Sequence, residues 1–151
     1  MTDPSRYQRD LDTLARTLWG EARSERRAGM EAVAWVVMNR FARPCWWSRN
    51  RGDGIEDDTI EAVCRDPWQF SCWNPKDPNL PKLLGVDQQD RHFRLALEVA
   101  AQAMSGQLPP PPQPGACHYK VSSRPWPKDW GPERPTPDYV VGHHSFYVGI
   151  K

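Results

Sequence analysis

The prolines divide this chain of 151 residues into two parts that cannot fold alike. Ten of its 16 prolines follow residue 108. Because proline lacks the backbone N–H and its ring clashes with the preceding helical turn, helices are not expected in that last third. Its segments 115–121 and 138–149 are rich in β-branched and aromatic residues, which predicts two strands joined by a long Pro-rich loop over 122–137. The run PPPPQP at 109–114 is predicted to be a stiff turn, with a ligand for a proline-binding module as the alternative.

The first two thirds carry apolar residues at helical spacing. A helix over 7–22 is predicted because one face holds Tyr7, Leu11, Leu14, Ala15, Leu18 and Ala22. The following segment, AGMEAVAWVVMNRF, is apolar nearly all round, which is typical of a buried central helix.

Capping residues mark two further helices. Asp58 with Glu61 resembles a capping box, and Asp87 can cap a later helix. Gly106 stands where a helix stop belongs. The predicted helices are therefore 7–22, 27–41, about 59–65 and about 88–105, with a loop over 68–82. A mainly helical domain with a small C-terminal β-hairpin is an α+β fold.

The charges nearly cancel, with 20 Lys and Arg against 19 Asp and Glu and a formal net charge of +1. A dedicated nucleic-acid binder usually carries a clear basic excess, so we expect no nucleic-acid partner. No apolar run approaches the roughly 20 residues of a membrane helix, and the opening MTDPSRYQRDLD is unlike a secretory signal peptide. We therefore expect a protein that is made in the cytoplasm and does not bind membranes. We also expect a monomer.

The four cysteines are Cys45, Cys64, Cys72 and Cys117, and no two of them form a CxxC pair. A zinc ribbon or a thioredoxin-type motif is therefore not expected. Cys64 and Cys72 flank a segment that must turn. A disulfide between them in an oxidising compartment and a set of buried thiols are both open.

Glu21 is the candidate general acid. At about 100° per residue it lies at the border of the apolar stripe of the first helix, near the end of that helix. A carboxylate there is half in the core and half in a cleft, which is the environment that a general acid at neutral pH needs. The alternative is a solvated glutamate at a helix end. Glu25 is a candidate second acid, or else a surface partner of Arg23 or Arg26.

Several segments together resemble one known family. LARTLWGEARSE followed by GMEAVAWVVMNR is similar to the opening of the SleB-type cell wall hydrolases, the spore-cortex-lytic enzyme family. QFSCW at 69–73 resembles the central loop of that family. GACHY at 115–119 and GHHSFY at 142–147 resemble its closing β-hairpin. The resemblance covers about residues 11–148, and the short members that are similar to this chain look like phage or prophage endolysins.

The resemblance implies a lysozyme-like fold and an enzyme that cleaves the glycan strands of peptidoglycan. Glu21 would be the acid/base of a lytic transglycosylase, which cuts between N-acetylmuramic acid and N-acetylglucosamine and leaves a 1,6-anhydro end. One carboxylate suffices for that reaction, whereas a hydrolytic muramidase, the alternative, needs a second. No cofactor is implied. The expectation is a single catalytic domain over 1–151, without a separate wall-binding domain, that reaches the wall in the periplasm after release from the host cytoplasm.

The resemblance also implies a set of supporting residues. The substrate-binding residues expected from it are Gln69, Phe70, Ser71, Trp73, His118 and Tyr119. Phe70 and Trp73 can stack on the apolar C–H faces of sugars, or they can pack in the core. Asn39 and Arg40 match the family's NR, and we interpret them as structural residues that tie loop carbonyls. His144 matches the closing histidine of the family.

Two departures from the family and two rival functions remain. Ser24 replaces a family glycine, which would strain the backbone if that position needs a positive φ. PPPPQP replaces a Gly-containing turn, which affects substrate preference. A metal-dependent amidase or peptidase could draw ligands from His118, His143, His144 and the cysteines. However, there is no HExxH and adjacent strand histidines point to opposite faces, so we expect no metal. A non-catalytic glycan- or protein-binding module would leave Glu21 dispensable.

Overall fold

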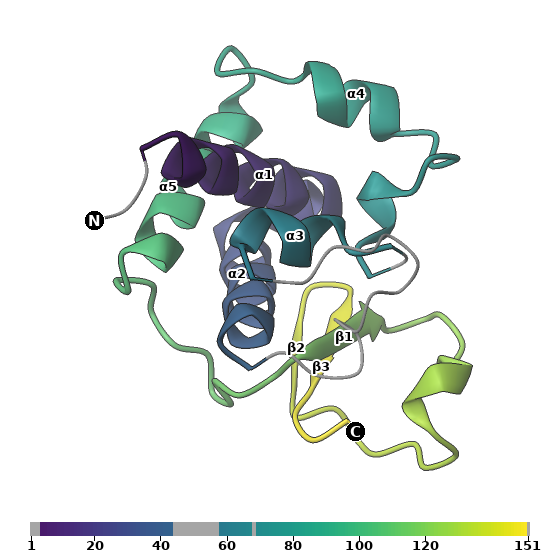
Figure 1. Ribbon diagram of the computed structural model, residues 1–151. Helices are drawn as coiled ribbons and strands as arrows, with labels where there is room; N and C mark the ends of the chain where they lie inside the picture. The colour runs from purple at the N-terminus through teal and green to yellow at the C-terminus, as the bar shows by residue number, and fades with distance from the viewer. Residues whose placement is uncertain (1–3, 44–57, 68, 151) are drawn as a thin grey trace.

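Helices form one side of the molecule and a small sheet forms the other (Figure 1). The computed structural model describes residues 4–43, 58–67 and 69–150. The helices are α1 (Pro4–Ala22), α2 (Arg26–Ala42), α3 (Ile60–Arg65), α4 (Leu80–Gly85) and α5 (Arg91–Met104). Short 3-10 turns are η1 (Arg23–Glu25), η3 (Ser71–Trp73) and η4 (Lys128–Trp130), and the strands are β1 (His118–Val121), β2 (Tyr139–Val141) and β3 (His144–Tyr147). The α+β class is confirmed. None of the helices in the described residues combines the length and apolar character needed to cross a lipid bilayer.

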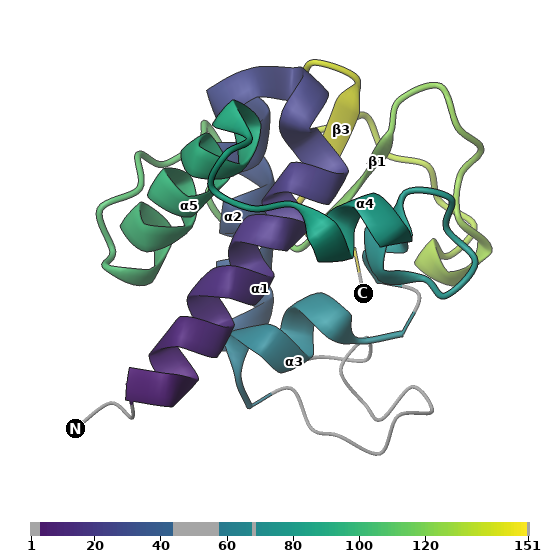
Figure 2. The same cartoon turned by 90° about the horizontal axis from the view of Figure 1, so that it is seen from above.

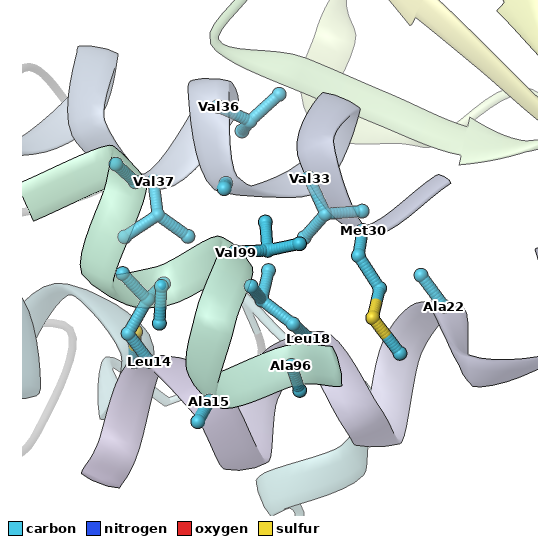
Figure 3. Close-up of a cluster of buried hydrophobic side chains, with 14 of the residues drawn as sticks. Leu14, Ala15, Leu18, Ala22, Met30, Val33, Val36, Val37, Ala96 and Val99 are labelled. Carbon is cyan, nitrogen blue, oxygen red and sulfur yellow. The ribbon is translucent and has the colours of Figure 1, made fainter. Parts of the chain in front are cut away.

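The core lies where α1, α2 and α5 meet (Figures 2 and 3). Leu14 and Leu18 of α1 and Val33 of α2 are fully buried together with Val99 of α5. Because α2 is covered by α1, by α5 and by the sheet, its apolar residues are buried nearly all round, as predicted. Tyr7 was expected on the apolar face of α1 but is 37% exposed, since the first turns of that helix extend past the core.

The predicted cap of α3 is wrong by one residue. Thr59, not Asp58, is the N-cap, and its hydroxyl accepts a hydrogen bond from the N–H of Ala62 at 3.0 Å. With Thr59 as N-cap, Glu61 stands one residue before the N3 position that a capping box requires. Its carboxylate instead binds Arg6 of α1 at 2.6 Å. The α3 helix is therefore tied to α1 by an ion pair.

The start of α5 also differs from the prediction. Asp90, not Asp87, is the N-cap, and its carboxylate accepts hydrogen bonds from the N–H groups of His92 (2.8 Å) and Phe93 (3.0 Å). Gly106 follows the helix with a φ of 75°, which confirms the predicted stop.

The loop predicted over 68–82 is correct only in its first part. Residues 80–82 begin α4, whose Leu83 is buried. Pro81 lies in the first turn of α4, where the missing N–H removes no helical hydrogen bond. The proline that suggested a loop is thus compatible with a helix start.

The last third contains three strands, not the two that were predicted. Segment 138–149 holds both β2 and β3, because Gly142 (φ 56°) and His143 form a tight turn between them. The strand order is β1-β3-β2 with antiparallel pairing, so β1 lies against β3 and the Pro-rich loop crosses from one edge of the sheet to the other.

The C-terminal end of α2 holds the connection that leads into the sheet. The side-chain amide of Asn39 donates to the carbonyl of Ala116 at 2.9 Å, and the guanidinium of Arg40 donates to the carbonyl of Cys117 at 2.7 Å. Arg40 is buried, so its bond is shielded from water. The structural role interpreted for both residues is confirmed, and it fixes where β1 begins.

Candidate active site

Glu21 lies in the last turn of α1, half-buried, at the wall of a cleft of about 440 Å³. The cleft separates the end of α1 and the segment around η3 from β1 and the loop that follows it. Its lining residues are Gly20, Glu21, Gln69, Ser71, Asp77, Tyr119, Lys120, Val121, Arg124, Pro125, Pro127 and His144.

Donors from two different segments hold the carboxylate of Glu21. The hydroxyl of Tyr119 donates to Oε1 at 2.5 Å. The backbone N–H of Cys72 and the hydroxyl of Ser71 contact Oε2 at 3.3 and 3.4 Å. The contact at Oε1 is short and the two at Oε2 are long, so Oε2 is the less firmly held oxygen.

Tyr119 and Cys72 keep their protons beside this carboxylate. Burial, and then the negative charge of Glu21, raise the pKa of the Tyr119 hydroxyl well above its usual value. The same two causes raise the pKa of the Cys72 thiol. Tyr119 is therefore a hydrogen-bond donor at neutral pH, and the thiol of Cys72 is not a thiolate nucleophile.

Gly20 explains how η3 comes so close to α1. A Cβ at residue 20 would lie 2.6 Å from the Cβ of Cys72 and 2.9 Å from its sulfur, so a larger residue would displace η3. The indole N–H of Trp73 donates to the hydroxyl of Thr17 at 2.9 Å, so η3 is also anchored to α1 one helical turn before Glu21. The glycine before Glu21 thus allows the backbone N–H of Cys72 to reach the carboxylate.

Cys64 and Cys72 are both buried, and no disulfide joins them. Cys45 lies outside the described residues. The structure therefore has Cys64 and Cys72 as buried thiols, which is one of the two alternatives open for this pair; the other is a disulfide.

Three of the expected substrate-binding residues line the cleft: Gln69, Ser71 and Tyr119. The side-chain oxygen of Gln69 accepts a hydrogen bond from Arg40 at 2.9 Å, which leaves the NH₂ group of the amide as its other polar end. The buried Arg40 therefore supports both the start of β1 and one residue of the cleft wall.

The other three expected residues do not line the cleft. Phe70 is 1% exposed and packs against the guanidinium of Arg40. Trp73 is half-buried against α1, with Arg65 over its ring at 4.9 Å. In the structure both rings pack in or against the core, which is one of the two alternatives open for them; the other is stacking on sugars.

His118, another residue expected to bind substrate, is not among the residues that line the cleft. Successive side chains of a strand alternate between faces, so His118 and Tyr119 point to opposite sides of β1. His118 is 1% exposed and its ring lies edge-on to Trp130 at 5.1 Å. Burial, reinforced by the charge of Arg40, lowers its pKa to about 3.

Glu25 has a position unlike that of Glu21. Its side chain is 5% exposed, and both carboxylate oxygens lie 3.0 Å from the backbone N–H of His143. A Cβ at Gly142 would collide with this carboxylate, so glycine is required there for space as well as for its positive φ. The expected alternative of a surface partner for a neighbouring arginine is not what the structure contains. Glu25 instead ties the β2–β3 turn to the junction between α1 and α2.

Ser24 causes no backbone strain of the expected kind. Within the described residues, the non-glycine residue with a positive φ is Arg26, at 62°, directly after Glu25. The strained residue therefore lies two positions beyond the serine, where α2 begins.

His144 lines the cleft beside Tyr119, with their rings edge-on at 5.2 Å. Its Nδ1 is 3.7 Å from a carboxylate oxygen of Glu25. Burial lowers the pKa of His144, although the carboxylates of Glu25 and Glu21 act to raise it. The imidazole is therefore neutral at neutral pH.

Sequence reasoning did not identify Asp77 and Arg124 as cleft residues. Asp77 lies between two prolines in the segment after η3, and its carboxylate accepts a hydrogen bond from the N–H of Asn79 at 2.8 Å. Arg124 follows the end of β1 by three residues. Asp–Pro–Asn and Arg–Pro sequences indicate turns, but the direction in which a loop returns to a cleft has no local signal.

No three His, Cys, Asp or Glu side chains lie close enough to hold a metal ion among residues 4–43, 58–67 and 69–150.

A half-buried carboxylate in a polar cleft, with hydroxyl and amide donors fixed around it, defines a candidate site for acid–base chemistry. The chain belongs to the Cell Wall Hydrolase family, of the SleB type, which matches residues 24–147. That family implies an enzyme that degrades peptidoglycan. The match contains the QFSCW, GACHY and GHHSFY segments and begins three residues after Glu21. No curated protein and no solved structure matches the chain.

Proposed function

We propose that the protein is a lytic transglycosylase that cleaves the bond between N-acetylmuramic acid and N-acetylglucosamine, with Glu21 as the acid/base. The observation that carries this proposal is the setting of Glu21 in the cleft. Its Oε1 is fixed by Tyr119 at 2.5 Å, while Oε2 has only longer contacts. Oε2 is therefore the oxygen that would carry the proton to a substrate.

In the first step, Glu21 gives its proton to the glycosidic oxygen, and the bond from that oxygen to C1 of the muramic sugar breaks. N-acetylglucosamine leaves with a free C4 hydroxyl. In the second step, the C6 hydroxyl of the muramic sugar attacks C1, and its proton returns to Glu21. The product ends in a 1,6-anhydro sugar, and no water is consumed.

The hydrogen bonds that Glu25 accepts from the backbone of His143 support a reaction that uses one carboxylate. A nucleophile or a base that activates water must reach the reacting sugar. Glu25 does not line the cleft, and the N–H of His143 occupies both of its oxygens. Glu25 is therefore a poor candidate for the second acid.

The walls of the cleft carry groups suited to the sugars. Gln69 and Ser71 offer an amide and a hydroxyl to N-acetyl and hydroxyl groups on one wall, and Tyr119 and His144 offer a hydroxyl and a neutral imidazole on the other. We further propose that this fold, in which helices face a small sheet across the acid, is lysozyme-like.

Asp77 favours a second candidate function, a hydrolytic muramidase. It is the other carboxylate in the lining of the same cleft, and only one of its oxygens has a hydrogen bond in the described residues. If Asp77 activates a water against C1, the product keeps a free reducing end.

The masses of released muropeptides distinguish these two candidates. An anhydro terminus is lighter than a hydrolytic one by about 18 mass units, because the C6 hydroxyl has replaced the attacking water. It also resists borohydride, since it has no free anomeric centre. Digested sacculi should give termini whose mass borohydride does not change. Termini that all gain two hydrogens would show hydrolysis and direct attention to Asp77, and new amino groups without glycan cleavage would indicate an amidase or peptidase.

We also propose the biological role of a phage-type endolysin, on the likeness of the motifs to those of short phage and prophage members. The chain produced inside a bacterium together with a membrane pore should lyse the culture. Cells that keep growing with an intact wall would contradict that role but not the enzymatic activity.

A further inference from the structure

One cation in the wall of the cleft has no partner among the residues that the structure describes. Arg124 is exposed and lines the cleft that contains Glu21. Its side chain makes no hydrogen bond or ion pair with the described residues, whereas Arg6, Arg16 and Arg40 are all paired. The guanidinium of Arg124 is therefore available to a ligand.

The backbone that carries Arg124 is held in place. Its N–H donates to the carbonyl of Val121 at 3.0 Å, which closes a turn directly after β1. Prolines on both sides of Trp126 restrict the chain that follows. Trp126 packs edge-on to Trp130 and to Tyr147, each at 5.2 Å. The guanidinium thus extends from a fixed point on the cleft wall.

The charges of the cleft are segregated by chain segment. The carboxylates, Glu21 and Asp77, come from α1 and the segment after η3, and the cations, Lys120 and Arg124, come from β1 and its following turn. The ammonium of Lys120 already donates to the carbonyls of Val121 and Ser122, at 2.8 and 3.1 Å. Arg124 is therefore the cation left for an anionic part of the substrate.

We propose that Arg124 binds a carboxylate of the peptide stem attached to N-acetylmuramic acid, an inference that rests on the proposed glycan cleavage. The N-acetylated sugars themselves offer no charge except through the lactyl group, and in intact peptidoglycan that group carries a short peptide with free carboxylates. A guanidinium matches a carboxylate with two parallel hydrogen bonds. The substrate class of the cleft is thus stem-bearing glycan rather than glycan from which the peptides have been removed.

The test compares Arg124→Gln with wild-type enzyme on three soluble glycan substrates. The first has native stems, the second has stems whose carboxylates are converted to amides, and the third has had its stems removed by an amidase, which leaves a lactyl carboxylate. Lys128→Gln is the matched control, because it removes one positive charge from the same loop outside the cleft lining.

On native stems, Arg124→Gln should raise KM about three- to fivefold with kcat unchanged, as expected for an exposed ion pair. On amidated stems and on stripped strands the variant should equal wild type, and Lys128→Gln should equal wild type throughout. The difference on native stems should also shrink at high salt.

An undiminished effect of Arg124→Gln on amidated stems would overturn the proposal, and so would an effect confined to stripped strands, which would assign Arg124 to the lactyl carboxylate. If wild-type enzyme cuts all three substrates and Arg124→Gln changes none of the constants, the stem site is refuted while the glycan-cleaving function stands. If wild-type enzyme cuts no glycosidic bond, the proposed function fails and the stem site fails with it.

Discussion

The hydroxyl of Tyr119 provides a sharp test of how Glu21 is held. Phenylalanine at this position keeps the ring that stacks on Phe146 at 5.4 Å and loses only the 2.5 Å bond to Oε1 of Glu21. A hydrogen bond to a charged group contributes about 1.5–3 kcal/mol, so its loss corresponds to roughly a tenfold to hundredfold fall in rate if that bond orients the acid. We expect kcat on soluble glycan strands to fall by this factor while KM stays close to that of wild type.

Tyr139→Phe is the matched control. Tyr139 stacks on the other side of Phe146 at 4.8 Å, and its buried hydroxyl has no hydrogen-bond partner in the described residues. Its removal should leave kcat unchanged and should not lower stability, because a buried unpaired hydroxyl is unfavourable. A loss below about threefold in Tyr119→Phe, or an equal loss in both variants, would refute the positioning role of Tyr119.

Two further predictions concern carboxylates outside the cleft. Glu25→Gln should reduce lysis less than Glu21→Gln does. It should lower the thermal midpoint, because the N–H of His143 contacts both oxygens of Glu25 and glutamine replaces one of them with an NH₂ donor. Equal loss of lysis in both variants would indicate hydrolysis with two acids. Asp90→Ala should cost about 1 kcal/mol of stability through loss of a helix cap, and more than Asp87→Ala costs. Burial acts to raise the pKa of Asp90, but hydrogen bonds from three N–H groups outweigh burial and hold it below its usual value. Its contribution is therefore complete above the unfolded pKa of about 3.9 and is lost as pH falls through the lower folded pKa. Urea unfolding at neutral and acidic pH should show the difference between wild type and Asp90→Ala shrinking in acid, and a difference independent of pH would contradict this.

Long helices were predictable because their apolar spacing repeats over several turns. That spacing identified α1 and the buried α2, and the position of Asn39 and Arg40 at the end of α2 was enough to interpret them as structural. The caps were not predictable, because neighbouring residues compete for each role. Asp90 is chosen over Asp87 by tertiary structure, since the indole N–H of Trp19 also binds its carboxylate.

The third strand was not predicted because the turn between β2 and β3 is only two residues long, Gly142 and His143. The apolar and aromatic pattern of 138–149 continues through Gly142 and His143, so one long strand and a hairpin look alike in the sequence. The pairing of β1 with β3 rather than β2 is a long-range choice that no local pattern specifies.

The candidate site was only partly predictable, because part of it depends on long-range packing. The border position of Glu21 follows from one helix alone. Which residues of QFSCW face the cleft depends on how the loop packs on α1. The sequence therefore did not reveal that Ser71 lines the cleft while Phe70 is buried. Gly20 is the local signal that sequence reasoning did not use, because a glycine near a helix end indicates close approach of another segment.

The most direct test of Glu21 as the catalytic acid is the lytic rate of Glu21→Gln on bacteria with a permeabilised outer membrane. Glutamine is nearly isosteric with glutamate, and its one side-chain oxygen can still accept the hydrogen bond of Tyr119, but it cannot donate the proton that the leaving oxygen requires. Circular dichroism and thermal unfolding should show an intact fold. Lysis should be abolished, and a rate above a few per cent of wild type would contradict the assignment of Glu21 as the acid.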